Sequence, residues 1–250
     1  MAAEHISAFA ERFDGTVSWM LVPTASSIRR DLLPAYAEIP PQKAVIDKAY
    51  ELVSEKVGTI DCYSTLAASR GNVYYRTDPH WTSLGAYMGY SSCSNQMGFS
   101  PLAADRFDIE HVSHSFTGSL CERIGYSLPP DTIDLYSPHG TTVSAAMSVY
   151  NGEEWIPREG MYFRERLDDG YAVFPGGETA LTIETNLSAP ALLVMGDSYA
   201  NALLPFFASH YSRITLVNVA TPEAELRSLI DLNTYDQILL CGTLNSFAQF

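Results

Sequence analysis

The chain has 250 residues, 46% of them hydrophobic, and its 29 acidic residues outnumber its 15 Lys and Arg residues to give a formal net charge of −14. This length and composition predict an ordinary folded core, and we expect one α/β domain over residues 1–250. The negative charge repels nucleic-acid phosphates and anionic membrane surfaces, and no local basic patch offsets it. We therefore expect no nucleic-acid partner.

No apolar run reaches the roughly 18 residues that a helix needs to cross a bilayer. The first stretch, MAAEHISAFAERF, lacks the basic and apolar regions of a signal peptide. We expect a soluble chain, which is either exported, with a leader or membrane anchor outside the given sequence, or cytoplasmic.

The four cysteines match neither a metal-binding nor a redox spacing, and they leave three pairings of two disulfides open. Cys241 ends the apolar run QILLC and is predicted to be a small buried thiol.

In chain order, the run TVSWMLVP (16–23) predicts a buried strand, because it is apolar, rich in β-formers and closed by proline. Helical spacing of apolar residues predicts an amphipathic helix over 41–57. The stretches TIDCYS (59–64) and VYYR (73–76) are weaker extended candidates. Thr82 is then expected to cap a helix whose many small residues allow a close approach to a neighbour.

From about residue 105 to 187 the sequence has short alternating segments and many turn residues, which predicts a β-rich insertion. The last part alternates strands and helices, which indicates a mainly parallel sheet covered on both faces. Its elements are expected at ALLVM (strand), 204–211 (helix), RITLVNV (strand), a helix with Thr221 as N-cap and Pro222 as first residue, and QILLC (strand).

The stretch YRTDPHWTSLGAYMGY (75–90) places Asp78 two residues before His80. Such a pair can handle a proton, ligate a metal, or lie in a turn before a helix. Zinc needs further ligands, and the other histidines show no matching pattern, so we expect no metal site. Pro79 stiffens the loop, which can then bring the Asp78 carboxylate to Nδ1 of His80.

A second motif, GDSY, follows the apolar strand ALLVM and delivers Ser198 at the carboxyl end of a strand, where open α/β sheets bind ligands. A serine there can act as a nucleophile if a histidine base and an orienting carboxylate lie within reach. Asp78 and His80 are the obvious partners. The alternative is a turn in which Ser198 only caps the next helix.

Together these motifs resemble a known family. GDSY resembles the nucleophile block of SGNH (GDSL-like) hydrolases, and YYRTDPHWTSLGAY resembles the signature of bacterial DHHW proteins and their alginate O-acetyltransferase relatives, in which the Asp-x-His motif precedes the serine. VPTASSIRRDLLP, YAVFPGG and MGDSYANALLPFFASHYSRI extend the likeness over most of the chain. The resemblance implies a three-layer α/β/α fold with a mainly parallel sheet and no metal or organic cofactor.

Carried over residue by residue, the resemblance implies that Ser198 is the nucleophile, His80 the general acid/base and Asp78 its orienting carboxylate. An oxyanion hole is also required, and the backbone N–H of Ser198 is its first candidate. LLCGTLNSF loosely resembles the SGNH block that supplies an asparagine donor, which makes Asn245 a candidate. The glycine pair of FPGGE, Gly176 and Gly177, is a further candidate, although a hairpin turn explains it equally well.

Aromatic residues are abundant and suit the stacking of sugar rings, with Tyr75, Trp81 and Tyr199 nearest the motifs. Packing in the core is the competing role for these rings. Relatives tend to carry an arginine after the strand that follows the serine block, and Arg227, on the next helix, or Arg76 is a candidate substitute. A surface ion pair is its alternative role.

The resulting hypothesis is a serine-dependent acyl-ester hydrolase or O-acetyltransferase whose substrate is a small-molecule or polysaccharide ester of the bacterial envelope or extracellular space. The carbohydrate nature of the substrate and its location are inferred from the family resemblance alone. The alternative hypothesis is a non-catalytic envelope scaffold or polysaccharide-binding module with a relic triad. A third hypothesis is a cytoplasmic esterase for small esters. The acyl donor, the acceptor and the oligomeric state stay open.

Overall fold

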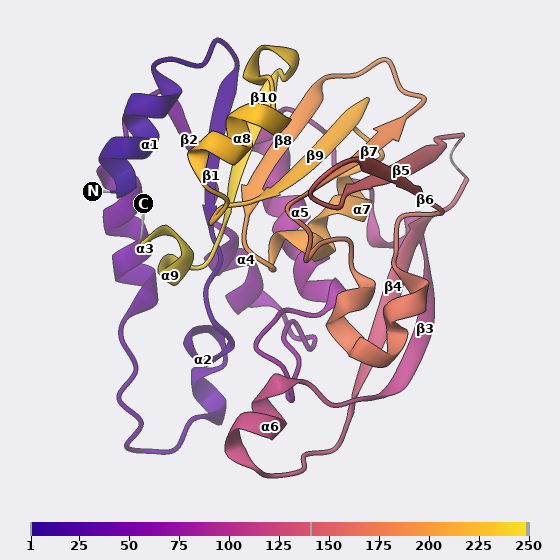
Figure 1. The fold of residues 1–250 in the computed structure, drawn as a ribbon. Coiled ribbons are helices and arrows are strands. Elements are labelled where there is room, and N and C mark those ends of the chain that lie inside the picture. The colour runs from indigo at the N-terminus through magenta and orange to yellow at the C-terminus, as the bar shows by residue number, and fades with distance from the viewer. Residues whose placement is uncertain (1, 141, 249–250) are drawn as a thin grey trace.

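The computed structural model describes residues 2–140 and 142–248. Their main feature is one eight-stranded sheet with the strand order β2–β1–β10–β8–β9–β7–β5–β6 (Figure 1). The first five strands of this order run parallel, and β7, β5 and β6 are antiparallel to their neighbours. The strands are β1 (Thr16–Leu21), β2 (Val57–Thr59), β5 (Ala145–Tyr150), β6 (Trp155–Arg158), β7 (Ala180–Thr185), β8 (Ala191–Gly196), β9 (Arg213–Asn218) and β10 (Gln237–Gly242).

Both faces of the sheet are buried, because alternate residues of a strand point to opposite sides. In β1, for example, Trp19 joins one hydrophobic cluster and Met20 joins the other, and Leu193 and Val194 of β8 divide in the same way. Helices cover both faces. The Trp19 face packs against α1 (Ala2–Ala10), α3 (Gln42–Glu51), α8 (Glu223–Leu229) and α9 (Leu244–Phe247), and the Met20 face against α2 (Ala25–Ile28), α4 (Cys62–Ala68), α5 (Ser83–Met97) and α7 (Leu204–Phe207).

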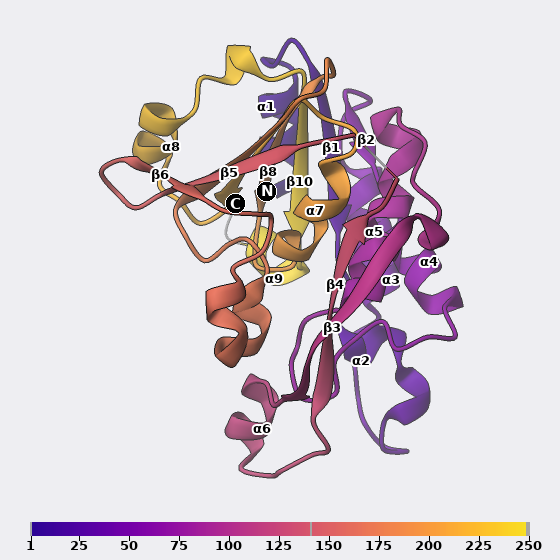
Figure 2. The same cartoon turned by 90° about the vertical axis from the view of Figure 1, so that its right-hand side faces the viewer.

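The β-rich segment contributes to two sheets. Strands β3 (Phe107–Phe116) and β4 (Asp131–Pro138) form a separate antiparallel ribbon, and the short helix α6 (Ser119–Ile124) lies between them at its far end (Figure 2). Strands β5, β6 and β7 instead extend the main sheet, and a 3₁₀ segment over Arg164–Val173 precedes β7. The predicted α/β fold with a mainly parallel sheet is confirmed.

The predicted cap and close packing of α5 are confirmed. Thr82 accepts a hydrogen bond from the backbone N–H of Gly85 at 3.2 Å. A Cβ atom on Gly89 would lie 2.8 Å from the indole of Trp81, so only glycine lets this helix lie so close to the loop that precedes it. Helix α5 thus has a sequence-determined start that follows directly on the Asp-x-His motif.

Two predictions for the N-terminal half are wrong. The helix predicted over 41–57 ends at Glu51. Val57 instead belongs to β2 and pairs with Val17 of β1, so strand pairing overrides the helical spacing of the sequence. TIDCYS is not extended throughout, because the Asp61 side chain accepts from the N–H of Ser64 and caps α4, which begins at Cys62.

Two smaller corrections fall in the last third. Helix α8 begins one residue later than predicted, with Pro222 as its N-cap and Glu223 as its first residue. The helix predicted over 204–211 is shorter than expected. It consists of the single turn of α7, which ends at Phe207 and is preceded by a 3₁₀ turn (Ala200–Leu203).

All four cysteines are free and buried, as predicted for Cys241: Cys62, Cys93, Cys121 and Cys241. Within the described residues, no helix has both the length and the apolar character needed to cross a membrane.

Candidate active site

The turn after β8 presents Ser198 to solvent at the carboxyl edge of the parallel strands. Asp197 fixes this turn, because its Oδ1 accepts from the N–H of Tyr199 at 3.0 Å and its Oδ2 accepts from the N–H of Thr243 at 2.8 Å and from the hydroxyl of Ser246 at 2.6 Å. The carboxylate therefore ties the serine turn to the segment after β10. Ser198 makes no capping hydrogen bond to the following 3₁₀ turn, so its hydroxyl is not used as a helix cap.

The second part of the site is the loop that carries Asp78 and His80. Backbone hydrogen bonds close its base, from the N–H of Tyr75 to the carbonyl of His80 at 3.2 Å and from the N–H of Thr82 to the carbonyl of Val73 at 3.0 Å. Inside the loop, the N–H of His80 donates to Oδ1 of Asp78 at 3.1 Å. These bonds hold an irregular segment in one conformation.

Asp131, the first residue of β4, clamps the same loop from outside. Its Oδ2 accepts three hydrogen bonds, from the N–H of Arg76 at 3.0 Å, the N–H of Thr77 at 2.8 Å and the hydroxyl of Thr77 at 2.7 Å. Asp131 and Thr77 are both buried, so each donor would be costly to leave unpaired. The β3–β4 ribbon thereby positions the loop.

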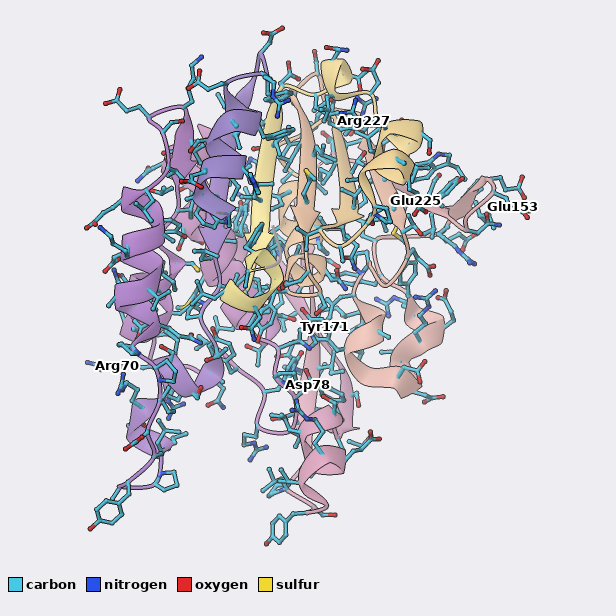
Figure 3. The ribbon with its side chains drawn as sticks, turned by 60° about the vertical axis from the view of Figure 1, so that its left-hand side comes forward. Arg70, Asp78, Glu153, Tyr171, Glu225 and Arg227 are labelled. Atoms are coloured by element: carbon cyan, nitrogen blue, oxygen red, sulfur yellow. The ribbon has the colours of Figure 1, made fainter. Side chains whose placement is uncertain are left out.

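The two loops meet, and their side chains form a relay. His80 Nδ1 lies 2.5 Å from Oδ1 of Asp78, and His80 Nε2 lies 2.6 Å from Oγ of Ser198. Asp78 is only 6% exposed, while Ser198 faces solvent. Figure 3 shows Asp78 beneath the strand ends, close to Tyr171. The three side chains named from the sequence are thus brought together in the order carboxylate, imidazole, hydroxyl.

Asp78 is held in its charged form. Burial by itself would raise the pKa of this carboxyl, but the hydrogen bond and charge of His80, with the backbone N–H groups of His80 and Ser119, bring the pKa below its ordinary value. The approach of Ser119 depends on Gly118, where a Cβ atom would lie 2.4 Å from Cβ of Asp78 and 2.8 Å from the carbonyl oxygen of Thr77.

Tyr171, the first residue of the YAVFPGG stretch but given no role from the sequence, completes the surroundings of the histidine. Its ring stacks on His80 with centroids 3.8 Å apart and planes 6° from parallel, and its hydroxyl donates to the carbonyl of Ser198 at 3.2 Å. Burial raises the pKa of Tyr171 well above its usual range, so the hydroxyl stays a donor. Tyr171 comes from the irregular 3₁₀ segment before β7, where no periodic pattern marks it.

Three residues singled out from the sequence lie around the site but not in the relay. Trp81 and Tyr199 are buried, and the Trp81 Nε1–H donates to the carbonyl of Tyr199 while the Tyr199 hydroxyl donates to the carbonyl of Pro79. Both rings thus brace the loop from behind. Arg76 is exposed and makes an ion pair with Asp131 at 3.3 Å, which was its alternative role.

The proposed oxyanion donors lie at different places. Within the described residues, the backbone N–H of Ser198 has no acceptor. Gly176 and Gly177 lie in a loop between the 3₁₀ segment and β7 rather than in a hairpin turn, and Gly177 has φ +81°. Asn245 is exposed on α9, and its side chain makes no hydrogen bond to the relay.

A cavity of about 750 Å³ opens beside Asp78 and Tyr171. Its walls are the end of β3, the start of α6 and the end of the 3₁₀ segment, which contribute mainly polar residues, including His114, Glu122 and Asp169. A binding space therefore adjoins the relay on the side of its carboxylate.

Comparisons with known proteins identify the family of the chain. A family model described as "DHHW protein" matches residues 6–217. The chain belongs to the DHHW protein family. No curated protein sequence matches the chain significantly.

Solved structures share the fold of this DHHW protein. A DHHW family protein from Eubacterium siraeum is 22% identical, with a TM-score of 0.82 over 98% of this chain and 84% of the other. Bacillus cereus PatB1 with a sulfonyl adduct is 16% identical, with a TM-score of 0.80 over 98% and 87%. The O-acetyltransferase domain of Pseudomonas putida AlgJ is 14% identical, with a TM-score of 0.53 over 97% and 79%. At these identities the likeness establishes the SGNH-like fold.

Proposed function

We propose that this DHHW protein transfers acyl groups through Ser198, either to water as an esterase or to a sugar hydroxyl as an O-acetyltransferase. One observation carries the proposal: an exposed serine hydroxyl lies 2.6 Å from the free nitrogen of a histidine whose other nitrogen lies 2.5 Å from a buried carboxylate. This is the relay that activates a serine nucleophile.

The chemistry follows from the order of the groups. Oγ of Ser198 attacks the ester carbonyl carbon while Nε2 of His80 takes the hydroxyl proton, and the carbonyl electron pair moves onto its oxygen. As the oxyanion collapses, the bond to the leaving alcohol breaks and His80 returns the proton to that alcohol. Water or a sugar hydroxyl then attacks the acyl-serine by the same two steps, and Ser198 is restored.

The surrounding groups match the charges that develop. Asp78 stays ionised, keeps the Nδ1 proton of His80 in place and stabilises the imidazolium that forms. The N–H of Ser198, which has no acceptor among the described residues, is available to the oxyanion. No metal ion or organic cofactor takes part in these steps.

The substrate we propose is an acyl ester of a carbohydrate, either small or polymeric, in the bacterial envelope or extracellular space. The cavity beside Asp78 has room for a sugar unit, and its polar walls suit hydroxyl groups. The O-acetyltransferase domain among the proteins of the same fold supports the acyl-transfer class.

The competing function is a saccharide-binding scaffold with an unused relay. Turnover of an aryl acetate separates the two. We expect the wild type to release acetate, Ser198→Ala to lose at least about 1,000-fold in kcat, and His80→Ala to lose a similar factor. Adding oligosaccharides tests the acceptor, because an O-acetyltransferase forms acetylated sugar at the expense of free acetate. Equal rates for the wild type and Ser198→Ala would contradict the proposal.

A further inference from the structure

Asn201 is a buried polar residue for which the relay offers no role. It is 8% exposed and lies in the 3₁₀ turn three residues after Ser198. Within residues 2–140 and 142–248, its side-chain amide makes no hydrogen bond, and neither amide atom is among the enclosed atoms without a partner, so the amide is open to solvent. The amide is therefore a donor that a bound ligand can reach.

Asn201 belongs to the turn that presents the serine. Its N–H donates to the carbonyl of Ser198 at 3.3 Å, which is the i to i+3 bond of a 3₁₀ turn. Asn201 is thus tied directly to the backbone of the nucleophile.

Gly176 holds the amide in this position. A Cβ atom on Gly176 would lie 2.2 Å from both Cγ and Nδ2 of Asn201 and 2.3 Å from Oδ1, so the amide lies against a backbone that only glycine keeps open. The neighbouring segment also carries Tyr171, whose hydroxyl reaches the carbonyl of Ser198. Gly176 thus leaves room for the Asn201 amide beside the segment that carries Tyr171.

We propose that the Nδ2–H of Asn201 and the backbone N–H of Ser198 together form the oxyanion hole. This inference rests on the proposed function, since the hole accepts the carbonyl oxygen of the ester when its electron pair is released by the attack of Ser198. When the carbonyl reforms, the negative charge on the oxygen that these two donors stabilise is lost. Asn201 is then a catalytic residue, and it replaces Asn245, the donor that the sequence motif indicates.

The test uses the full chain and an aryl acetate, with active sites titrated by a fluorophosphonate so that kcat refers to competent enzyme. Asn201→Asp keeps the shape and removes the NH₂ donor, and Asn201→Ala removes the whole amide. We expect both variants to lose about 100-fold to 1,000-fold in kcat with KM nearly unchanged. Phenylboronic acid, which forms a tetrahedral adduct on serine, should bind more weakly to both.

The controls separate this role from a structural one. Asn233→Ala changes an exposed asparagine far from the serine turn and should keep wild-type kinetics. A structural role for Asn201 predicts a lower melting temperature with unchanged kcat per titrated site, and that result would overturn the proposal. A loss in Asn245→Ala with none in Asn201→Asp would also overturn it. If the wild type itself does not hydrolyse the aryl acetate, it is the proposed function that is contradicted, before any role of Asn201 is tested.

Discussion

The imidazole of His80 lies flat on the ring of Tyr171, with centroids 3.8 Å apart and planes 6° from parallel. This contact covers one face of the histidine and leaves its edge nitrogens to Asp78 and Ser198. Because the Tyr171 hydroxyl also donates to the carbonyl of Ser198, one residue positions both the base and the nucleophile.

Two substitutions at Tyr171 separate these contributions. Tyr171→Phe keeps the stacked ring and removes one hydrogen bond, so we expect kcat to fall only about threefold to tenfold. Tyr171→Leu removes the stack as well, and a misplaced base should cost about 100-fold. Steady-state kinetics on an aryl acetate measure both. Equal losses in the two variants would show that the stacked ring does not position His80.

Asp131 is predicted to act at a distance from the chemistry. Asp131→Ala leaves three donors of Arg76 and Thr77 without their acceptor, and we expect the free energy of unfolding to fall by about 2–4 kcal/mol. Asp131→Asn keeps one acceptor oxygen and should lose less. Urea denaturation measures both values. If Asp131→Ala were as stable as the wild type, the hydrogen bonds of Asp131 to the loop would contribute nothing to the free energy of unfolding.

Gly118 allows the backbone to approach Asp78. In Gly118→Ala the added methyl group meets Cβ of Asp78 and the carbonyl of Thr77, so the loop must shift. We expect a loss of about 1–3 kcal/mol in stability, and lower kcat because Asp78 moves. Thr117→Ala, at the exposed neighbouring position, is the matched control. Wild-type kcat in Gly118→Ala would mean that the relay tolerates the shift.

The lowered pKa of Asp78 makes stability depend on pH in a defined direction. Its contribution is complete above the unfolded value of about 3.8 and is lost as the pH falls toward the lower folded value. Between about pH 5 and pH 2, the wild type should therefore lose more stability than Asp78→Asn. Chemical denaturation across this range measures the difference. Glu55→Gln, which changes an exposed carboxylate, should follow the wild type. Parallel curves for the wild type and Asp78→Asn would contradict the lowered pKa.

The features that the sequence predicts correctly are local or follow from sheet geometry. Thr82 is recognisable as a cap from its neighbours, and Ser198 from its place after a buried parallel strand. Because the Asp-x-His loop and the serine turn have their own signatures, their meeting is also predictable.

The remaining features depend on contacts between segments far apart in the chain. Asp131 and Tyr171 come from the β-rich segment, and they enter the site only through tertiary packing. Tyr171 begins the YAVFPGG stretch, but no motif assigns a role to either residue. Val57 fits a helical pattern but pairs with β1 instead. Asn201 lies in the stretch MGDSYANALLPFFASHYSRI, but only the structure shows that its amide packs against Gly176 and makes no hydrogen bond to the described residues.

The most direct test of the central claim is the mass of the intact protein after reaction with a fluorophosphonate or a sulfonyl fluoride. We predict that the wild type gains one probe mass, that peptide mapping locates it on Ser198, and that Ser198→Ala gains none. His80→Ala and Asp78→Ala should react slowly, because the hydroxyl is no longer activated. Equal labelling of the wild type and Ser198→Ala, or a wild type that stays unlabelled while it releases acetate, would contradict a nucleophilic Ser198.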